Sequence, residues 1–160
     1  MENKNESAKG PLSGVKIVDL STIVFGPYGS QIMADLGADV IKVESGHGDN
    51  MRLPGNSPKR GMGPLYLALN RNKKSLKLEL KNPKALAAMR KLLEDADVFY
   101  TNVRKAGLER LGLGYDAVKA INPSIVYVHC TGFGEDGPYG GKLAYDDVVQ
   151  AASGFADLLP

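Results

Sequence analysis

Short apolar runs alternate along the chain with segments of helical periodicity. The runs typical of strands are residues 15–20, 39–44, 75–80, 98–100 and 124–130. The segments typical of helices begin at Pro27, Asn82–Pro83, Ala106, Tyr115 and Tyr145. Repeated strand–helix alternation predicts an α/β fold, with a Rossmann-like, mostly parallel sheet and helices on both faces.

Two of these helices have clear sequence limits. Pro27 suits a first turn, the side chains of Tyr28, Ile32 and Leu36 fall on one helical face, and Gly37 suits a left-handed end. The second begins with a cap and a first-turn proline, Asn82–Pro83, and its apolar stripe consists of Leu86, Met89 and Leu93.

The remaining segments are described by composition. Residues 45–64 are rich in glycine and proline, which indicates an irregular loop. Residues 75–80 alternate polar and apolar side chains, as a half-buried strand does. Residues 124–130 are almost continuously apolar, as in a strand that is covered on both faces.

Composition excludes several classes of protein. The 160 residues are 43% hydrophobic and 24% charged with a formal net charge of +2, typical of a globular domain without a nucleic-acid-binding arm. The single cysteine, Cys130, excludes an internal disulfide, and it is interpreted as a buried thiol. With only His47 and His129 beside it, no metal site is expected. No apolar stretch reaches membrane-spanning length and no signal peptide is present, so a cytoplasmic protein is expected.

Ligands of parallel sheets bind in the loops at the carboxyl ends of strands. The loops to consider are 21–27, 45–50, 101–105 and 131–142. Glu44 ends the second strand, where a dinucleotide fold places its ribose-binding acid, but Gly26-Pro27-Tyr28-Gly29 is not the G-x-G-x-x-G pattern. NAD binding is therefore disfavoured against a structural loop or another ligand.

Two charged groups allow alternative interpretations. The cluster Asn70-Arg71-Asn72-Lys73-Lys74 either neutralises phosphates or forms a solvated turn. Asp146 and Asp147 are neighbours on a helix, so their side chains point about 100° apart and do not face each other as an acid–base pair. Helix capping or surface exposure is the favoured interpretation of these two carboxylates.

Six segments in order resemble the N-terminal part of the family III CoA-transferases, the CaiB/BaiF family. They are residues 11–20, 35–44, 70–75, 96–102, Gly132-Phe133-Gly134 with Gly137-Pro138-Tyr139, and 144–154. The resemblance implies a transferase that moves CoA between an acyl-CoA and a carboxylic acid. In such enzymes an aspartate attacks the thioester, and an anhydride and an enzyme-bound thioester follow. It also implies an interlocked homodimer, CoA as substrate rather than cofactor, and no role for nucleic acid, membrane or metal.

The resemblance also implies a set of CoA-binding positions. These are Val24, Phe25, Ser45, Leu78, Glu79, Leu80, Lys81, Asn102, Val103, Arg104, Arg110, Lys142 and Tyr145. Ser45 stands where the family often has an arginine near the CoA phosphate, and His47, Arg52 or Arg60 are possible replacements.

No catalytic residue is assigned within this sequence. The family's nucleophilic aspartate falls beyond Pro160, and Asp146–Asp147 match a different helix of the pattern. Residues 1–10 are expected to be a flexible polar tail, and 11–160 a CoA-binding domain that stops before its C-terminal end. A non-catalytic CoA-binding or interaction module is the alternative.

A fragment of an α-methylacyl-CoA racemase is the less favoured alternative. The racemase pattern has His-Asp at the positions where this chain has Tyr145-Asp146. Tyrosine is a poor base at neutral pH because a phenol ionises near about pH 10.

Overall fold

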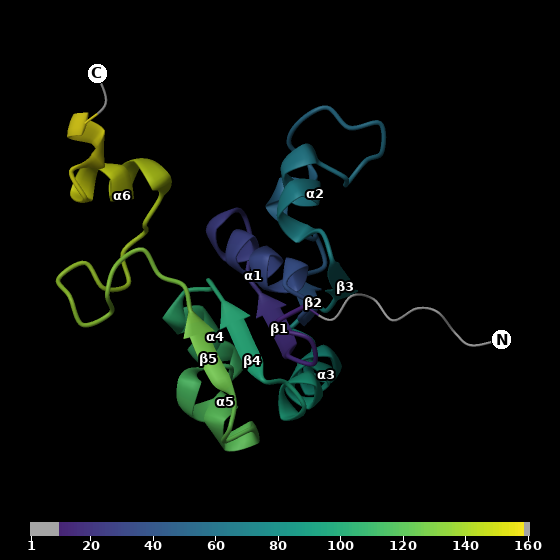
Figure 1. Ribbon diagram of the computed structural model, residues 1–160. Helices are drawn as coiled ribbons and strands as arrows, with labels where there is room; N and C mark the ends of the chain where they lie inside the picture. Colours follow the sequence, from purple (N-terminus) through teal and green to yellow (C-terminus); the bar gives the residue numbers. More distant parts are fainter. Residues whose placement is uncertain (1–9, 159–160) are drawn as a thin grey trace. The chain divides into compact units, whose positions relative to one another are not determined.

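The computed structural model describes residues 10–158. Within this range the expected α/β order is present (Figure 1). The strands are β1 (Lys16–Leu20), β2 (Asp39–Glu44), β3 (Lys73–Lys77), β4 (Val98–Thr101) and β5 (Val126–His129). The α-helices are α1 (Phe25–Asp35), α2 (Pro64–Asn70), α3 (Pro83–Glu94), α4 (Lys105–Leu111), α5 (Tyr115–Ile121) and α6 (Asp146–Ala152), with short 3-10 helices at Asn50–Arg52 and Phe155–Leu158.

The five strands form one parallel sheet in the order β3-β2-β1-β4-β5. The chain moves outward from β1 to β2 and β3, then returns to the other side of β1 to form β4 and β5. The order of strands therefore reverses between β1 and β4, where Leu20 pairs with Thr101. Such a switch point is where ligands bind in open parallel sheets.

One face of the sheet carries the apolar core. Val18 of β1, Val43 of β2 and Phe99 of β4 pack with Met89 of α3 and Val118 of α5, all at most 3% exposed. The expected stripe of α3 is confirmed, since Met89 and Leu93 are buried and Leu86 packs against the core. Asn82 caps α3 by accepting a hydrogen bond from the backbone N–H of Lys84 at 2.9 Å.

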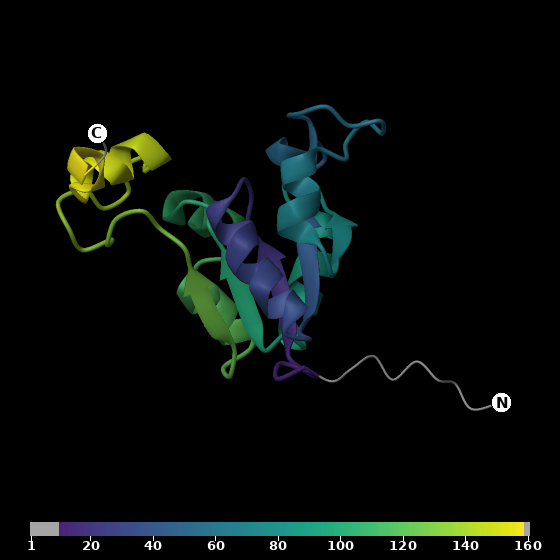
Figure 2. The ribbon, with the colours of Figure 1, turned by 45° about the horizontal axis from the view of Figure 1, so that its top comes forward.

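The opposite face, beneath α1 and α2, carries buried charged residues beside the apolar Ile17 and Val40. Asp19, Lys42 and Glu44 project from β1 and β2 on this side and are 3% exposed or less. Figures 1 and 2 show α1 lying along the strands. Its buried residues are Gly26, Pro27, Ser30, Gln31 and Ala34.

The apolar stripe of α1 consequently faces outward. Tyr28, Ile32 and Leu36 are 54%, 43% and 40% exposed. The periodicity of these residues is helical, as expected, but the polar strand face selects the opposite, small and polar side of the helix for burial. Gly37 has the expected positive φ, 100°, after the helix ends.

Three element assignments from the sequence are corrected. The third strand is Lys73–Lys77 rather than 75–80, because its hydrogen-bonded register is set by β2. The irregular loop expected over 45–64 is present apart from a short 3-10 helix, but no helix was expected where α2 begins at Pro64. β5 is an edge strand of the described sheet and is not covered on both faces, since Val126 is 57% exposed.

The chain forms two compact units. The first contains the sheet and extends to His129, and the second begins at Cys130 and contains α6. The polar tail expected over residues 1–10 lies outside the described residues except for Gly10, and the domain expected over 11–160 stays a prediction. None of the helices within residues 10–158 has the length and apolar character needed to cross a membrane.

Candidate functional site

The loops that follow β1 and β4 are joined at the switch point of the sheet. The side-chain amide of Asn102 accepts a hydrogen bond from the Thr22 N–H at 3.0 Å and donates one to the Thr22 carbonyl at 2.9 Å. The Thr101 hydroxyl donates to the Leu20 carbonyl at 3.0 Å. The two loops where the sequence places ligand contacts are therefore fixed to each other.

The β1–α1 loop also contacts a buried ion pair formed by Lys42 and Asp49. Lys42 Nζ donates to the Ser21 carbonyl at 2.8 Å and lies 2.9 Å from Asp49 Oδ2. Asp49 Oδ1 accepts from the Ile23 N–H at 3.3 Å. Ile23 has a φ of 74°, which is rare for a β-branched residue.

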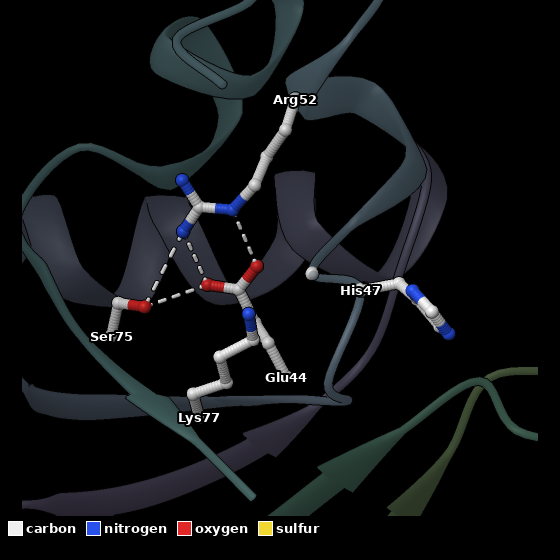
Figure 3. A pocket seen from close by; sticks show the side chains of 6 residues that line it. Glu44, His47, Arg52, Ser75 and Lys77 are labelled. Atoms are coloured by element: carbon white, nitrogen blue, oxygen red, sulfur yellow. Dashed lines mark hydrogen bonds and ion pairs between the residues drawn. The ribbon is translucent and has the colours of Figure 1, made fainter. Parts of the chain in front are cut away.

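A shallow polar cavity of about 210 Å³ lies at the carboxyl ends of β2 and β3 (Figure 3). It is lined by Glu44, His47, Gly48, Arg52, Ser75 and Lys77. Arg52 grips both oxygens of the Glu44 carboxylate, with Nε to Oε2 at 2.7 Å and Nη2 to Oε1 at 2.5 Å. The Ser75 hydroxyl donates to Glu44 Oε1 at 2.7 Å.

These contacts set the ionisation of Glu44. Burial alone would raise the pKa of this carboxyl, but the hydrogen bonds from Arg52, Ser75 and the Asp49 N–H outweigh it and lower the pKa from 4.5 to about 2. Burial, together with the nearby Glu44 charge, raises the pKa of Tyr66 to about 12. Both groups keep their ordinary charge at neutral pH, so the cluster is a structural one rather than an acid–base pair.

Glu44 should contribute an acid-dependent part of the stability. Because its folded pKa is lower than its unfolded pKa, its stabilising effect is complete above about pH 4.5 and is lost as the pH falls toward 2. We expect Glu44→Gln to remove about 2 kcal/mol at pH 7, allowing for screening around the partly exposed Arg52, and to flatten the acid limb. Urea unfolding of both chains between pH 2 and 7 measures this, and parallel acid limbs would contradict it.

The structure removes two of the sequence interpretations. The Glu44 carboxylate is occupied by Arg52, Ser75 and Tyr66, so it is not available to a ribose. Arg52 is equally engaged, since it also donates to the Gly61 carbonyl at 3.2 Å, and it does not replace an arginine at Ser45 as a free phosphate ligand. His47, on the cavity wall, and the exposed Arg60 remain as candidates.

The basic cluster of residues 70–74 serves the fold. Lys73 Nζ is buried and bonds to Asp19 Oδ2 at 3.1 Å, and burial lowers the pKa of its ammonium group. Arg71 pairs with Asp35 at 2.5 Å and Lys74 with Asp39 at 2.7 Å. Lys73 therefore neutralises a buried carboxylate, whereas the side chains of Arg71 and Lys74 are 57% and 69% exposed, as the solvated turn predicts.

Most of the expected CoA-binding positions of the first unit follow the carboxyl ends of the strands. Val24 and Phe25 open α1 and are 41% and 67% exposed. Leu78 to Lys81 follow β3, with Leu78 and Leu80 packed against the core and Glu79 and Lys81 exposed.

The other positions follow β4 or belong to the second unit. Asn102 and Val103 are partly buried, Arg104 precedes α4, and Arg110 lies in its last turn. Lys142 and Tyr145 belong to the second unit, where Lys142 Nζ lies 4.6 Å from the ring centroid of Tyr139 and Tyr145 precedes α6.

Sequence reasoning missed the residues that hold the loop. Lys42 and Asp49 were not selected, although a lysine within a central parallel strand requires a buried partner and is a usable signal. Asp49 gave no such signal, because it lies in a glycine-rich segment of ordinary loop composition. Among the described residues, no group of three or more His, Cys, Asp or Glu side chains lies together as a metal site would require.

Comparison with known proteins identifies close relatives. The sequence model described as CoA-transferase family III matches residues 12–159. A succinate–glutarate CoA-transferase from Agrobacterium fabrum is 39% identical over an alignment of 157 residues that covers 94% of this chain and 39% of that protein. A human succinyl-CoA:glutarate CoA-transferase is 41% identical over 145 residues, 90% of this chain and 33% of that protein.

A solved structure shows the same fold. The CAIB/BAIF family protein from Brucella suis superimposes with a TM-score of 0.89 at 39% identity, over 95% of this chain and 41% of that one. The chain thus spans about two fifths or less of the length of these relatives.

Proposed function

The chain belongs to CoA-transferase family III, and from this we propose that it forms the CoA-binding part of an enzyme that transfers CoA from an acyl-CoA to a carboxylic acid. One observation carries the proposal. Most of the positions that the family resemblance assigns to CoA in the first unit follow the carboxyl ends of β1 to β4, and those after β1 and β4 lie beside the switch point. A parallel sheet of this order offers its ligand site at that edge.

The chemistry of these positions suits a nucleotide thioester. Val24 and Phe25 present apolar surface, while Lys81, Arg104 and Arg110 present cations. None of these three cations forms an ion pair with another residue in the described part of the chain. They are therefore available to phosphates, in contrast to the cations of residues 70–74.

We propose roles for the remaining positions as well. Ser45 adjoins the cavity that His47 lines, and His47 and the exposed Arg60 are the proposed substitutes for the missing arginine. Lys142 and Tyr145 of the second unit are proposed to contact CoA in the complete enzyme. The proposed ligands are an acyl-CoA and a carboxylate, and the proposed compartment is the cytoplasm.

Calorimetric titration of the chain with CoA tests the proposal. We expect binding, and we expect Arg104→Ala to weaken it about 10- to 100-fold, because a charge-assisted hydrogen bond to phosphate contributes about 1.5–3 kcal/mol. Lys91→Ala is the matched control, since this exposed lysine lies in the last turn of α3, away from the carboxyl ends of the strands. Absence of binding at millimolar CoA, or equal weakening by both variants, would refute the assignment.

A homodimer is part of the same proposal. The outward stripe of Tyr28, Ile32 and Leu36 carries no charge, and α1 has only one charged residue, Asp35, at its end. An uncharged apolar face of this kind suits a second copy of itself. A sedimentation coefficient that stays monomeric as concentration rises would contradict it.

A further inference from the structure

The loop between β1 and α1 contains backbone strain at a position where glycine would relieve it. Ile23 has a φ of 74°, and its branched side chain is 42% exposed, so the strain is not offset by burial of the side chain. A non-glycine residue keeps such a conformation only where the surrounding structure imposes it. The contacts around Ile23 therefore show which residues hold the loop in this conformation.

Three consecutive residues of this loop are held by side chains from other parts of the chain. The Ser21 carbonyl accepts from Lys42 Nζ at 2.8 Å, and both polar backbone groups of Thr22 bond to Asn102. The Ile23 N–H donates to Asp49 Oδ1 at 3.3 Å. The loop is thus fixed from β2, from the segment after β2 and from the segment after β4.

The Lys42–Asp49 pair is itself buried and anchored. The two side chains are 1% and 0% exposed, and their charged atoms are 2.9 Å apart. Asp49 is anchored twice more, because its N–H donates to Glu44 Oε2 at 2.8 Å and its Oδ1 accepts from the Met51 N–H at 2.9 Å. A buried ion pair contributes little net stability compared with apolar side chains of the same volume. Its value here lies in the geometry that it imposes on Ser21 and Ile23.

We propose that Lys42 and Asp49 are positioning residues that hold the β1–α1 loop in its strained conformation, so that Val24 and Phe25 meet the ligand already ordered. The ligand in question is the acyl-CoA of the proposed function, and this part of the inference rests on that proposal. Binding to an ordered loop avoids the entropy cost of fixing the loop in the complex. The strain at Ile23 is the stability cost of that order.

The matched pair Ile23→Ala and Ile23→Gly separates backbone strain from side-chain contact. Both variants lose the side chain, but only glycine relaxes the positive φ. We expect the glycine variant to melt about 3 °C above the alanine variant and to bind CoA about 3- to 10-fold more weakly. Opposite changes in stability and affinity are not produced by a purely structural role. Equal or tighter binding by the glycine variant would overturn the proposal.

Asp49 is tested through the order of the loop as well as through binding. In the chain without ligand, we expect Asp49→Ala to speed hydrogen exchange of the Thr22 and Ile23 amides and to weaken CoA binding about 3- to 10-fold. Asp49→Asn, which keeps an acceptor for the Ile23 N–H, should restore part of the slow amide exchange and part of the CoA affinity. Met89→Ala, in the core on the opposite sheet face, should lower the melting temperature but change neither the exchange of these amides nor the CoA affinity.

The outcomes distinguish this inference from the proposed function. If Met89→Ala weakens binding as much as Asp49→Ala, the pair has only a structural role and the inference is wrong. If the unaltered chain does not bind CoA, both the proposed function and the proposed effect of the loop on ligand binding are wrong. The exchange rates measured without ligand would then decide by themselves whether the Lys42–Asp49 pair orders the loop.

Discussion

Replacing Asp19 by alanine is expected to lower the free energy of unfolding by about 3–5 kcal/mol, a large part of the stability of an ordinary domain. Asp19 is 0% exposed, and its carboxylate accepts hydrogen bonds from the Ser21 N–H at 2.9 Å and the Ser30 hydroxyl at 2.6 Å. It also lies 3.1 Å from Lys73 Nζ, whose side chain is 1% exposed. Without the carboxylate, a buried ammonium group loses its counter-charge.

An exposed ion pair on the same sheet provides the control. Asp39 and Lys74 are 2.7 Å apart, but their side chains are 48% and 69% exposed, so Asp39→Ala should cost less than about 1 kcal/mol. Urea unfolding at pH 7 measures both variants. If Asp19→Ala does not fold, the double variant Asp19→Leu with Lys73→Met should regain stability, because it removes both charges together. Equal effects of Asp19→Ala and Asp39→Ala would show that the polar sheet face does not depend on this pair.

Apart from α2, the order of elements was predictable from local sequence, whereas the two faces of the sheet were not. Apolar runs and caps such as Asn82–Pro83 act within a few residues, so the strands, α3 and the end of α1 at Gly37 follow from them. Which side of α1 is buried depends on Asp19 and Lys73, which are 54 residues apart in sequence. Periodicity alone places Tyr28 on an apolar face of the helix, but it does not show which face of the helix the sheet buries.

The candidate site divides in the same way. Position after a strand is a local property, and it indicates the loops in which a ligand is expected, whereas Val24, Phe25 and Asn102 within or beside these loops come from the family resemblance. The function of a charge depends on its partner, which the sequence does not name. Lys73 and Arg52 form ion pairs with carboxylates of the chain, while Arg104 forms no ion pair with any described residue.

The 160-residue chain assayed by itself is expected to show no CoA transfer, with no turnover above the uncatalysed rate for any acyl-CoA and carboxylate pair. The proposed reaction requires a carboxylate placed against the thioester carbonyl, and placement supplies much of the rate enhancement in covalent catalysis. The family resemblance puts that aspartate downstream of α6.

The two carboxylates at the start of α6 do not suit the role. Asp146 and Asp147 are exposed in the first turn, and Asp146 Oδ2 accepts a hydrogen bond from Gln150 Nε2 at 2.7 Å. Asp146 is therefore paired along its own helix, and a water-exposed carboxylate has the ordinary low reactivity of its class. The predicted result is CoA binding without turnover, as a non-catalytic module would also show.

Assaying the chain with a panel of acyl-CoAs and acceptors, followed by hydroxylamine trapping, separates the possibilities. Turnover that appears only when a polypeptide carrying the downstream part of a relative is added would place the nucleophile outside residues 1–160. Turnover by the chain alone that Asp146→Ala or Asp147→Ala abolishes would place the nucleophile in α6 and refute the prediction.

Exchange of the α-proton of a chiral 2-methylacyl-CoA in deuterated water, without any acceptor, would favour racemase chemistry instead. That chemistry needs a base on each face of the α-carbon, and Tyr145 stands where the racemase pattern has a histidine.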